Sequence, residues 1–193
     1  MSSEQISEPR EAAPDGLGLV ADLVNTWEGE LGTETGTEEL DTPEALAAWM
    51  RGQGLTVDAP PNGDDLRRAI EFREALRALL LANTGAELDP AAVEVVRRAA
   101  NEAPLQVSVD AAGGARPEPA GEGVQALFAE ALAAIARAQA TGTWERLKAC
   151  TADDCHWAFY DRSRNRSRTW CSMDVCGNRS KTRSYRARRT GPA

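Results

Sequence analysis

The sequence predicts an α+β protein, in which a mostly helical N-terminal domain with a small β-sheet precedes a small cysteine-rich module with a basic C-terminal helix. Apolar residues recur at helical spacing through most of residues 1–143, whereas Leu105–Val109 alternates apolar and polar residues as a strand does. All four cysteines lie within 27 residues near the C-terminus. The charge also changes sign along the chain, which favours two modules with different partners.

The first half of the helical part contains two predicted elements separated by a loop. Residues 17–26 are mostly apolar but are interrupted by Asp22 and Asn25, which predicts a short strand running into a helical turn or loop. Residues 28–42 are rich in Gly, Thr and Glu and predict a loop. A capping residue, a proline and an acidic side chain then follow in order, so we expect a helix over Pro43–Arg51.

Two further helices are expected in the middle of the chain. The most regular pattern of apolar residues begins at Asp64 or Asp65 and ends at Gly85. A second helix is expected from Asp89 to about Asn101, because aspartate followed by proline is a favourable helix start.

A strand and an alanine-rich helix complete the acidic part. The predicted strand Leu105–Val109 is followed by a turn at residues 112–114. A long helix is then expected over residues 123–139, with a restart at Thr143 that leads into Cys150.

Length, composition and charge restrict the class of protein. The chain has 193 residues, and no run approaches the ~18 apolar residues of a membrane helix. Residues 1–14 are polar and lack the pattern of a secretory signal, so we expect a disordered leader and a cytoplasmic protein. Residues 1–143 carry 10 Arg against 25 Asp and Glu, a net charge of −15, whereas residues 144–193 carry 12 Lys and Arg against 5 Asp and Glu, a net charge of +7. Nucleic acid would repel the first segment and attract the second.

The cysteines form two matched pairs, each with four intervening residues, separated by a 15-residue spacer. Stable disulfides are not expected in a chain without a secretory signal. Four thiolates suit a closed, tetrahedral, structural zinc site. The spacing therefore predicts one structural Zn²⁺ bound by Cys150, Cys155, Cys171 and Cys176, with a redox dithiol pair as the competing interpretation.

His156 and the aromatic residues lie between the two cysteine pairs. His156 is either an alternative zinc ligand or a side chain beside the site, and the second is favoured because adjacent residues rarely direct both side chains toward one ion. Residues 157–161 alternate as a strand, which places Trp157 and Phe159 on one face. Together with Trp170 they are expected to form a small core, with base stacking as the alternative.

Two basic segments are the candidate nucleic-acid contacts. In an extended strand or loop, Arg162, Arg164, Arg166 and Arg168 would lie on one side and could follow a phosphate chain. A helix from about Asn178 would align three arginines on one face and a lysine on another, which favours a groove or backbone contact over a merely solvated terminus. These four residues are Arg179, Arg183, Arg186 and Lys181. Arg179 is also a candidate for pairing with a carboxylate such as Asp161.

Together these features resemble two known families. The basic segment resembles the CGNR zinc finger over about residues 144–189, and the acidic part resembles the ABATE domain that precedes this finger in bacterial proteins. The finger motif stands as Cys150-x4-Cys155, Trp157-x-Phe159, Asp161, Ser163–Arg168, Trp170-Cys-Ser-Met173 and Cys176-Gly-Asn-Arg179 with Lys181. The ABATE resemblance rests on Asp22-Leu-Val-Asn-Thr26 and on the helix Asp41-x-x-Glu44-Ala-Leu…Ala48-Trp49.

The resemblance implies an ABATE-like domain over residues 15–143, a finger over residues 144–189 and a short tail over residues 190–193. It further implies a stress-linked transcription regulator that binds DNA through the zinc-dependent segment, with a nucleoid location. The same four cysteines are then the zinc ligands.

Several alternatives stay open at this level. Asp22, Asn25 and Thr26 could line a ligand pocket, or Asp22 and Asn25 could cap a helix or satisfy a turn; the second is favoured. The acidic domain could sense a small molecule or form a homo-oligomer. RNA binding and a redox- or metal-responsive protein contact are alternative functions. An enzyme is not expected, because the chain has one histidine, no phosphate-binding glycine loop and no Gly-x-Ser-x-Gly motif.

Overall fold

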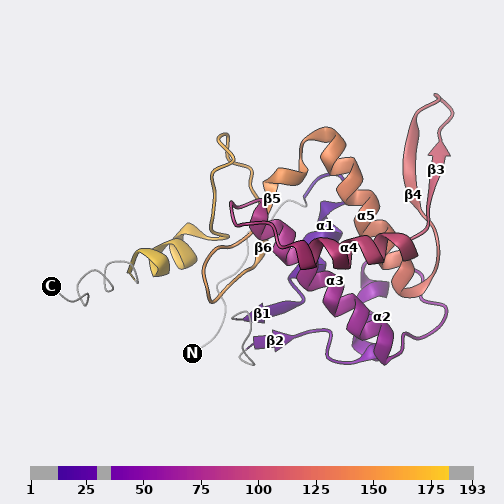
Figure 1. Ribbon diagram of the computed structural model, residues 1–193, viewed down its shortest axis with the longest axis horizontal. Coiled ribbons are helices and arrows are strands. Elements are labelled where there is room, and N and C mark those ends of the chain that lie inside the picture. The colour runs from indigo at the N-terminus through magenta and orange to yellow at the C-terminus, as the bar shows by residue number, and fades with distance from the viewer. Residues whose placement is uncertain (1–12, 30–35, 183–193) are drawn as a thin grey trace.

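The structure, a computed structural model, describes residues 13–29 and 36–182 of the chain (Figure 1). These residues form α-helices and three two-stranded antiparallel sheets, which confirms the predicted α+β class. In chain order the elements are α1 (Leu17–Val24), β1 (Trp27–Gly29), β2 (Gly36–Glu38), α2 (Pro43–Gly52), α3 (Gly63–Ala82), α4 (Pro90–Glu102), β3 (Leu105–Val109), β4 (Ala115–Pro119), α5 (Gly123–Thr141), β5 (Leu147–Ala149) and β6 (Ala158–Tyr160). We call α1 to α5 with β1 to β4 the helical body, and residues 147–182 the cysteine module.

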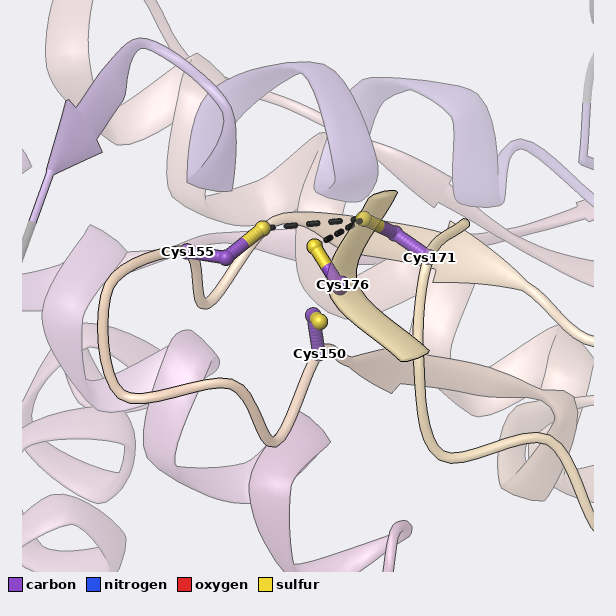
Figure 2. Close-up of side chains that lie close together, drawn as sticks. All are labelled: Cys150, Cys155, Cys171 and Cys176. Atoms are coloured by element: carbon purple, nitrogen blue, oxygen red, sulfur yellow. Dashed lines mark hydrogen bonds between the residues drawn. The ribbon is translucent and has the colours of Figure 1, made fainter. Parts of the chain in front are cut away.

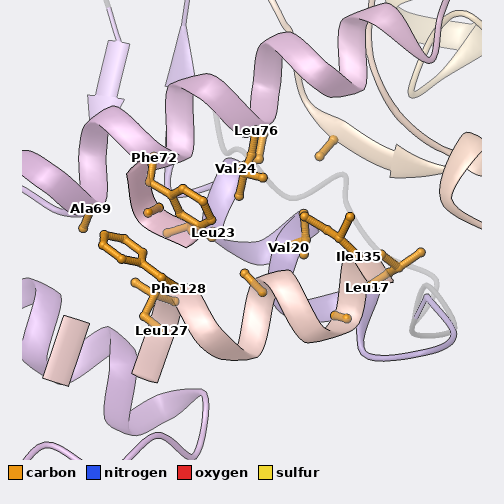
Figure 3. Close-up of a cluster of buried hydrophobic side chains, with 14 of the residues drawn as sticks. Leu17, Val20, Leu23, Val24, Ala69, Phe72, Leu76, Leu127, Phe128 and Ile135 are labelled. Carbon is orange, nitrogen blue, oxygen red and sulfur yellow. The ribbon is translucent and has the colours of Figure 1, made fainter. Parts of the chain in front are cut away.

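The core of the helical body lies where α1 packs against α3 and α5 (Figure 3). The rings of Phe72 on α3 and Phe128 on α5 lie 4.7 Å apart between centroids. Both are almost fully buried, as are Leu76 and Leu127 on the same two helices. Burial of these large apolar side chains is the main source of stability for the helical body.

The first element is a helix, so the prediction of a strand over residues 17–26 is wrong. Leu17, Val20, Leu23 and Val24 are completely buried, and their spacing of three to four residues places them on one helical face. The segment is apolar and short, and such segments do not distinguish strand from helix by pattern alone. Packing against α3 and α5 decides for the helix.

The predicted helix starts agree with the observed caps, with one shift. Thr42 accepts a hydrogen bond from the Ala45 N–H at the start of α2, and Asp89 accepts one from the Ala91 N–H at the start of α4. At α3 the capping residue is Asn62, slightly before the predicted start, and Asp65 closes a capping box with it.

The segment predicted as a loop over residues 28–42 contributes to a hairpin, in which β1 pairs with β2. Two buried arginines of α3 fix this region. Arg73 forms an ion pair with Glu38 of β2, with Nη1–Oε1 and Nη2–Oε2 distances of 2.5 and 2.7 Å. Arg77 donates to the Val24 and Trp27 carbonyls, and its guanidinium lies 5.2 Å from the centre of the Trp27 ring. Nothing in the sequence around these two arginines predicted that they would bind residues so far away along the chain.

The predicted strand Leu105–Val109 is confirmed as β3, and it pairs with β4 to form a ribbon beside α5 (Figure 1). The restart predicted at Thr143 is limited to a short 3-10 turn, Trp144–Arg146, after which the chain enters β5. In the described part of the chain, no helix is long and apolar enough to cross a membrane.

The β5–β6 hairpin anchors the cysteine module to the helical body. Leu147, Ala149 and Ala158 are buried in the same apolar cluster as α1, α3 and α5. The Asn83 side chain at the end of α3 donates to the Leu147 carbonyl over 2.9 Å, and the Thr84 hydroxyl donates to the Ala149 carbonyl over 2.9 Å. The module therefore extends from a hairpin that is part of the main core.

Candidate metal centre

The four cysteine side chains converge on one point of the cysteine module (Figure 2). Their sulfur atoms all lie within 4.8 Å of one another. The Sγ atoms of Cys155 and Cys171 are 3.6 Å apart, and those of Cys171 and Cys176 are 3.7 Å apart. A tetrahedral zinc ion with Zn–S bonds of about 2.3 Å places its sulfur ligands about 3.8 Å apart. The donor set and its spacing therefore fit one structural zinc ion, which would cross-link the module at this point.

The backbone around the cysteines is held by local hydrogen bonds. The Cys150 N–H donates to the Trp157 carbonyl over 2.9 Å, and the Cys155 N–H donates to the Ala152 carbonyl over 3.0 Å. The Thr151 N–H donates to the Thr169 carbonyl over 3.0 Å. This bond joins the segment between the first pair of cysteines to the segment just before the second pair. The backbone thus holds the two pairs facing each other.

Gly177 lies directly against the side chains of Met173 and Trp170. Gly177 lies at the end of the π-helix Met173–Gly177 and has no positive φ. A Cβ atom here would collide with the Met173 sulfur and would lie 3.4 Å from the Trp170 ring. The glycine thus allows Trp170 and Met173 to pack directly on the cysteine-bearing turn.

His156 is not part of the four-sulfur cluster. Its backbone has a φ of 50°, and its half-buried side chain is close enough to Arg77 of α3 for that positive charge to act on it. Burial, followed by this charge, lowers the pKa of His156. The histidine therefore lies beside the site at the junction with the helical body.

Arg179 balances the negative charge of the site. Its guanidinium donates to the Cys176 sulfur over 3.4 Å and forms an ion pair with Asp154 over 3.1 Å. A zinc ion with four thiolates carries a net charge of −2, so a neighbouring cation stabilises it. The predicted tie between Arg179 and a carboxylate is present, but the choice of Asp161 as an example is wrong.

Comparison with family models assigns both parts of the chain. A model described as "ABATE: Putative stress-induced transcription regulator" matches residues 17–141. The chain belongs to the ABATE family. A second model, the CGNR zinc finger, matches residues 146–189, so the ABATE domain precedes a CGNR finger here. A search of curated proteins finds no match.

The family assignment agrees with the geometry of the cysteines. The CGNR finger is a zinc-binding type, and its four cysteines here are placed for one structural zinc ion. Both matched families are of regulatory or zinc-finger type rather than enzyme families.

The arginine segment of the finger is a loop that turns back on itself, rather than an extended strand. Arg166 has a φ of 51°, and its N–H donates to the Ser163 carbonyl over 3.3 Å. Arg162 lies over the Tyr160 ring at 5.3 Å, and Arg168 lies over the Phe159 ring at 5.2 Å. The four arginines are still exposed, but on a loop whose two ends rest on the aromatic residues of β6.

A buried ion pair anchors this loop. The Lys148 ammonium group on β5 donates to the Asp161 carboxylate over 3.0 Å, and to the Arg166 and Arg168 carbonyls over 2.5 and 3.2 Å. Asp161 is fully buried and also accepts the N–H groups of Ser163 and Arg168, each over 2.9 Å. Burial opposes ionisation of Asp161, but these hydrogen bonds outweigh it and lower its pKa to about 2.

Lys148 is a residue that sequence reasoning missed. It stands between two apolar residues, Leu147 and Ala149, just before the first cysteine. In a strand this spacing places the lysine on the face opposite its apolar neighbours. This alternation could have predicted the orientation of Lys148 from the sequence.

Part of the predicted basic helix lies in the described chain. Residues 178–182 are helical, and Arg179 and Lys181 are exposed on them. The Thr182 hydroxyl donates to the Asn178 carbonyl over 2.9 Å within this turn. Arg183 and Arg186 lie outside the described residues.

The three residues predicted as a ligand pocket have separate surroundings. Thr26 is buried, donates to the Leu23 carbonyl and accepts from Arg73, so it holds the turn after α1. The Asn25 side chain accepts from the Ala158 N–H over 2.7 Å and donates to the Ala158 carbonyl over 3.1 Å, and thereby joins the ABATE domain to β6. Asp22 is exposed, although partial burial raises the pKa of its carboxyl group.

A groove runs between α1 and the finger, with a volume of about 540 Å³. Asp22 and Asn25 line it on the ABATE side, and Trp157, Arg162 and Arg168 line it on the finger side. Thr26 is not among its lining residues. The structure therefore brings two of the three predicted pocket residues to one groove, together with finger residues that were predicted for other roles.

Proposed function

We propose that this protein is a DNA-binding transcription regulator whose zinc-organised finger presents the Arg162–Arg168 loop and the basic tail to the phosphate backbone. The observation that carries the proposal is the exposed arginine loop, fixed between the four-cysteine site and the buried Lys148–Asp161 pair. A charged loop that is held in one conformation loses less entropy on binding than a free one. In this arrangement zinc has a structural role and the arginines make the contact.

The distribution of charge supports a one-sided contact. The −15 charge of residues 1–143 opposes the approach of the ABATE domain to DNA, whereas the +7 charge of residues 144–193 favours the approach of the finger. The division into an ABATE-like domain over residues 15–143 and a finger over residues 144–189 follows the same change of sign. A regulator of this kind would be found at the nucleoid in the cytoplasm.

The groove between α1 and the finger favours ligand sensing as an accompanying function. Its volume of about 540 Å³ suits a small organic molecule. Arg162 and Arg168 line the groove and also belong to the arginine loop, so a ligand here would compete with or reposition the DNA contact. An anion with an aromatic ring matches the guanidinium groups and Trp157.

The test is a binding titration of the full zinc-loaded chain against duplex DNA over a series of salt concentrations. Arg164→Ala, at the turn of the loop, is compared with Arg97→Ala, an exposed arginine on α4 of the ABATE domain. If Arg164 contacts a phosphate, its removal reduces the slope of log affinity against log salt by roughly 0.9. Arg97→Ala should leave the slope unchanged.

Other results would favour the alternative functions. Stronger binding to single-stranded RNA than to duplex DNA would indicate an RNA-binding protein. Loss of zinc and of binding after mild peroxide treatment would indicate a redox-responsive finger. Duplex binding without any salt dependence would overturn the phosphate-contact proposal for both nucleic acids.

A further inference from the structure

The β3–β4 ribbon has one apolar face that is largely exposed. Leu105, Val107 and Val109 of β3 occupy alternate positions, so their side chains lie on one face, and they are 44%, 73% and 65% exposed. Their partners in the register are Pro119, Pro117 and Ala115 of β4, which are also apolar. The opposite face carries polar residues, namely Gln106, Ser108, Arg116 and Glu118. A protruding ribbon with such a face is a typical interaction surface.

The two edges of this ribbon differ in their capacity to pair. The Asp110 N–H donates to the Gly114 carbonyl and the Ala120 N–H donates to the Pro104 carbonyl, both over 2.9 Å. In an antiparallel pair, residues that bond to the neighbouring strand alternate with residues that do not. The two bonds show that residues 105, 107 and 109 direct their N–H and carbonyl groups away from β4. On β4 the corresponding outward positions include Pro117 and Pro119, which have no N–H.

The pairing-competent edge is therefore that of β3. The prolines block the outer edge of β4, which also lies near α5. The β3 edge lies on the side away from that helix, with three outward N–H groups and no proline between Leu105 and Val109. One edge of the ribbon is protected against strand addition and the other is open to it.

An apolar groove lies next to the base of the ribbon. It has a volume of about 650 Å³ and is lined by Leu105 of β3 together with apolar residues of α3, α4, α5 and the adjacent loops. These include Leu88, Val96, Leu132, Ile135 and Trp144. Because Leu105 belongs to the apolar face of the ribbon, that face is turned toward the groove at the base of the ribbon.

We propose that a second copy of this chain docks on this surface, with the two β3 strands antiparallel and Val107 at the twofold axis. Pairing in this register places Val109 of the second copy beside Leu105, on the face that is turned toward the groove. About six backbone hydrogen bonds form between the two strands. The tip of each ribbon then covers the groove of the other copy, so the ribbon and the groove are complementary parts of one symmetric interface.

The distribution of charge favours a second copy as the occupant. Residues 105–119 carry one Arg and two acidic residues, a net charge of −1, whereas the whole of residues 1–143 carries −15. The ribbon is thus a place where two acidic domains can meet with little repulsion. A five-residue ribbon face covers only about 17 by 10 Å, well below the roughly 1,200 Å² of a stable interface. A stable dimer on this ribbon therefore has to bury the groove as well.

The test is the mass of the full zinc-loaded chain in solution, measured by light scattering or sedimentation across a concentration series. The native chain should show twice its mass of 20.7 kDa. Val107→Lys adds a charge to the apolar face, and Val107→Pro removes an outward N–H that the ribbon does not use itself. Each should raise the dimer dissociation constant about tenfold or more.

Gln106→Lys is the matched control, because it adds the same charge to the neighbouring residue on the opposite face. It should leave the dimer intact, and circular dichroism should show that all variants remain folded. A native chain that is monomeric at every concentration would overturn the proposal, as would dimers that survive both Val107 substitutions. The measurement requires no DNA, so its failure would not count against the proposed function.

Discussion

The ABATE domain and the outer finger, by which we mean the cysteine-bearing part that does not pack on the ABATE core, are stabilised in different ways. The ABATE domain buries a continuous set of large apolar side chains from α1, α3 and α5. In the described residues, the separate cluster of the finger contains four buried residues, of which two are cysteines. So small a cluster cannot hold a segment of about thirty residues by apolar burial alone. Bound zinc would therefore be the main source of stability for the outer finger, as the apolar core is for the ABATE domain.

The boundary between these two modes of stabilisation runs through the β5–β6 hairpin. Leu147, Ala149 and Ala158 face the core of the ABATE domain, whereas Phe159 belongs to the cluster of the finger. Lys148 lies on the same side as the arginine loop and binds Asp161. Because neighbouring strand residues point to opposite faces, one short hairpin serves both regions.

The largest expected effect comes from removal of one thiolate. Cys171→Ser should lower the zinc content from one ion per chain to near zero and unfold the outer finger, while the helical signal of the ABATE domain persists. Structural zinc contributes roughly 10–16 kcal/mol to isolated finger peptides. Metal analysis together with circular dichroism checks both parts of the prediction.

The control for Cys171→Ser is His156→Asn, which changes a residue outside the sulfur cluster and tolerates the φ of 50°. This variant should retain the metal. A collapse of the ABATE helices on zinc loss would show that the two regions are not separately stabilised.

The next effect tests whether the hairpin belongs to the core of the ABATE domain. Leu147→Ala removes a fully buried side chain and should lower the free energy of unfolding by about 2–5 kcal/mol, as Leu76→Ala should. The loss should appear even in the zinc-free chain, because Leu147 packs on the ABATE core rather than on the metal site.

Denaturant unfolding of the zinc-free variants measures this effect. Met173→Ala, at a finger residue that is 53% exposed, should change the free energy of unfolding by less than about 0.5 kcal/mol. If Leu147→Ala matched Met173→Ala in the zinc-free chain, the hairpin would depend on the metal and not on the core.

The smallest effect concerns Asp161, whose pKa falls from 3.8 to about 2 in the folded protein. A lowered pKa gives stability that is present above the unfolded value of 3.8 and is lost as the pH falls toward 2. The shift corresponds to about 2 kcal/mol. Asp161→Asn should remove this contribution at neutral pH.

The difference in unfolding free energy between the native chain and Asp161→Asn should therefore be constant near neutral pH and shrink below pH 3.8. Glu145→Gln, which changes a carboxylate that is 73% exposed, should show no comparable dependence. A difference that persists unchanged to pH 2 would contradict the assignment.

Several features were determined by local sequence. The starts of α2 and α4 follow from a capping side chain and a proline, and the fit of the cysteines to one zinc ion follows from their number and spacing. The helix caps join residues that are close along the chain, and the cysteines share one repeated spacing, so both features can be recognised in the sequence. The strand Leu105–Val109 was likewise visible in its alternation.

Other features were decided by tertiary contacts. Residues 17–24 are a helix because α3 and α5 bury one side of them, and their apolar run alone suits either element. The arginine segment is a loop rather than an extended strand because Lys148 and Asp161 draw its backbone inward. Asn25, a candidate pocket residue in the sequence, uses its amide to hold Ala158 across 133 positions of the chain. Such partners depend on which surfaces meet after folding, and no local periodicity encodes them.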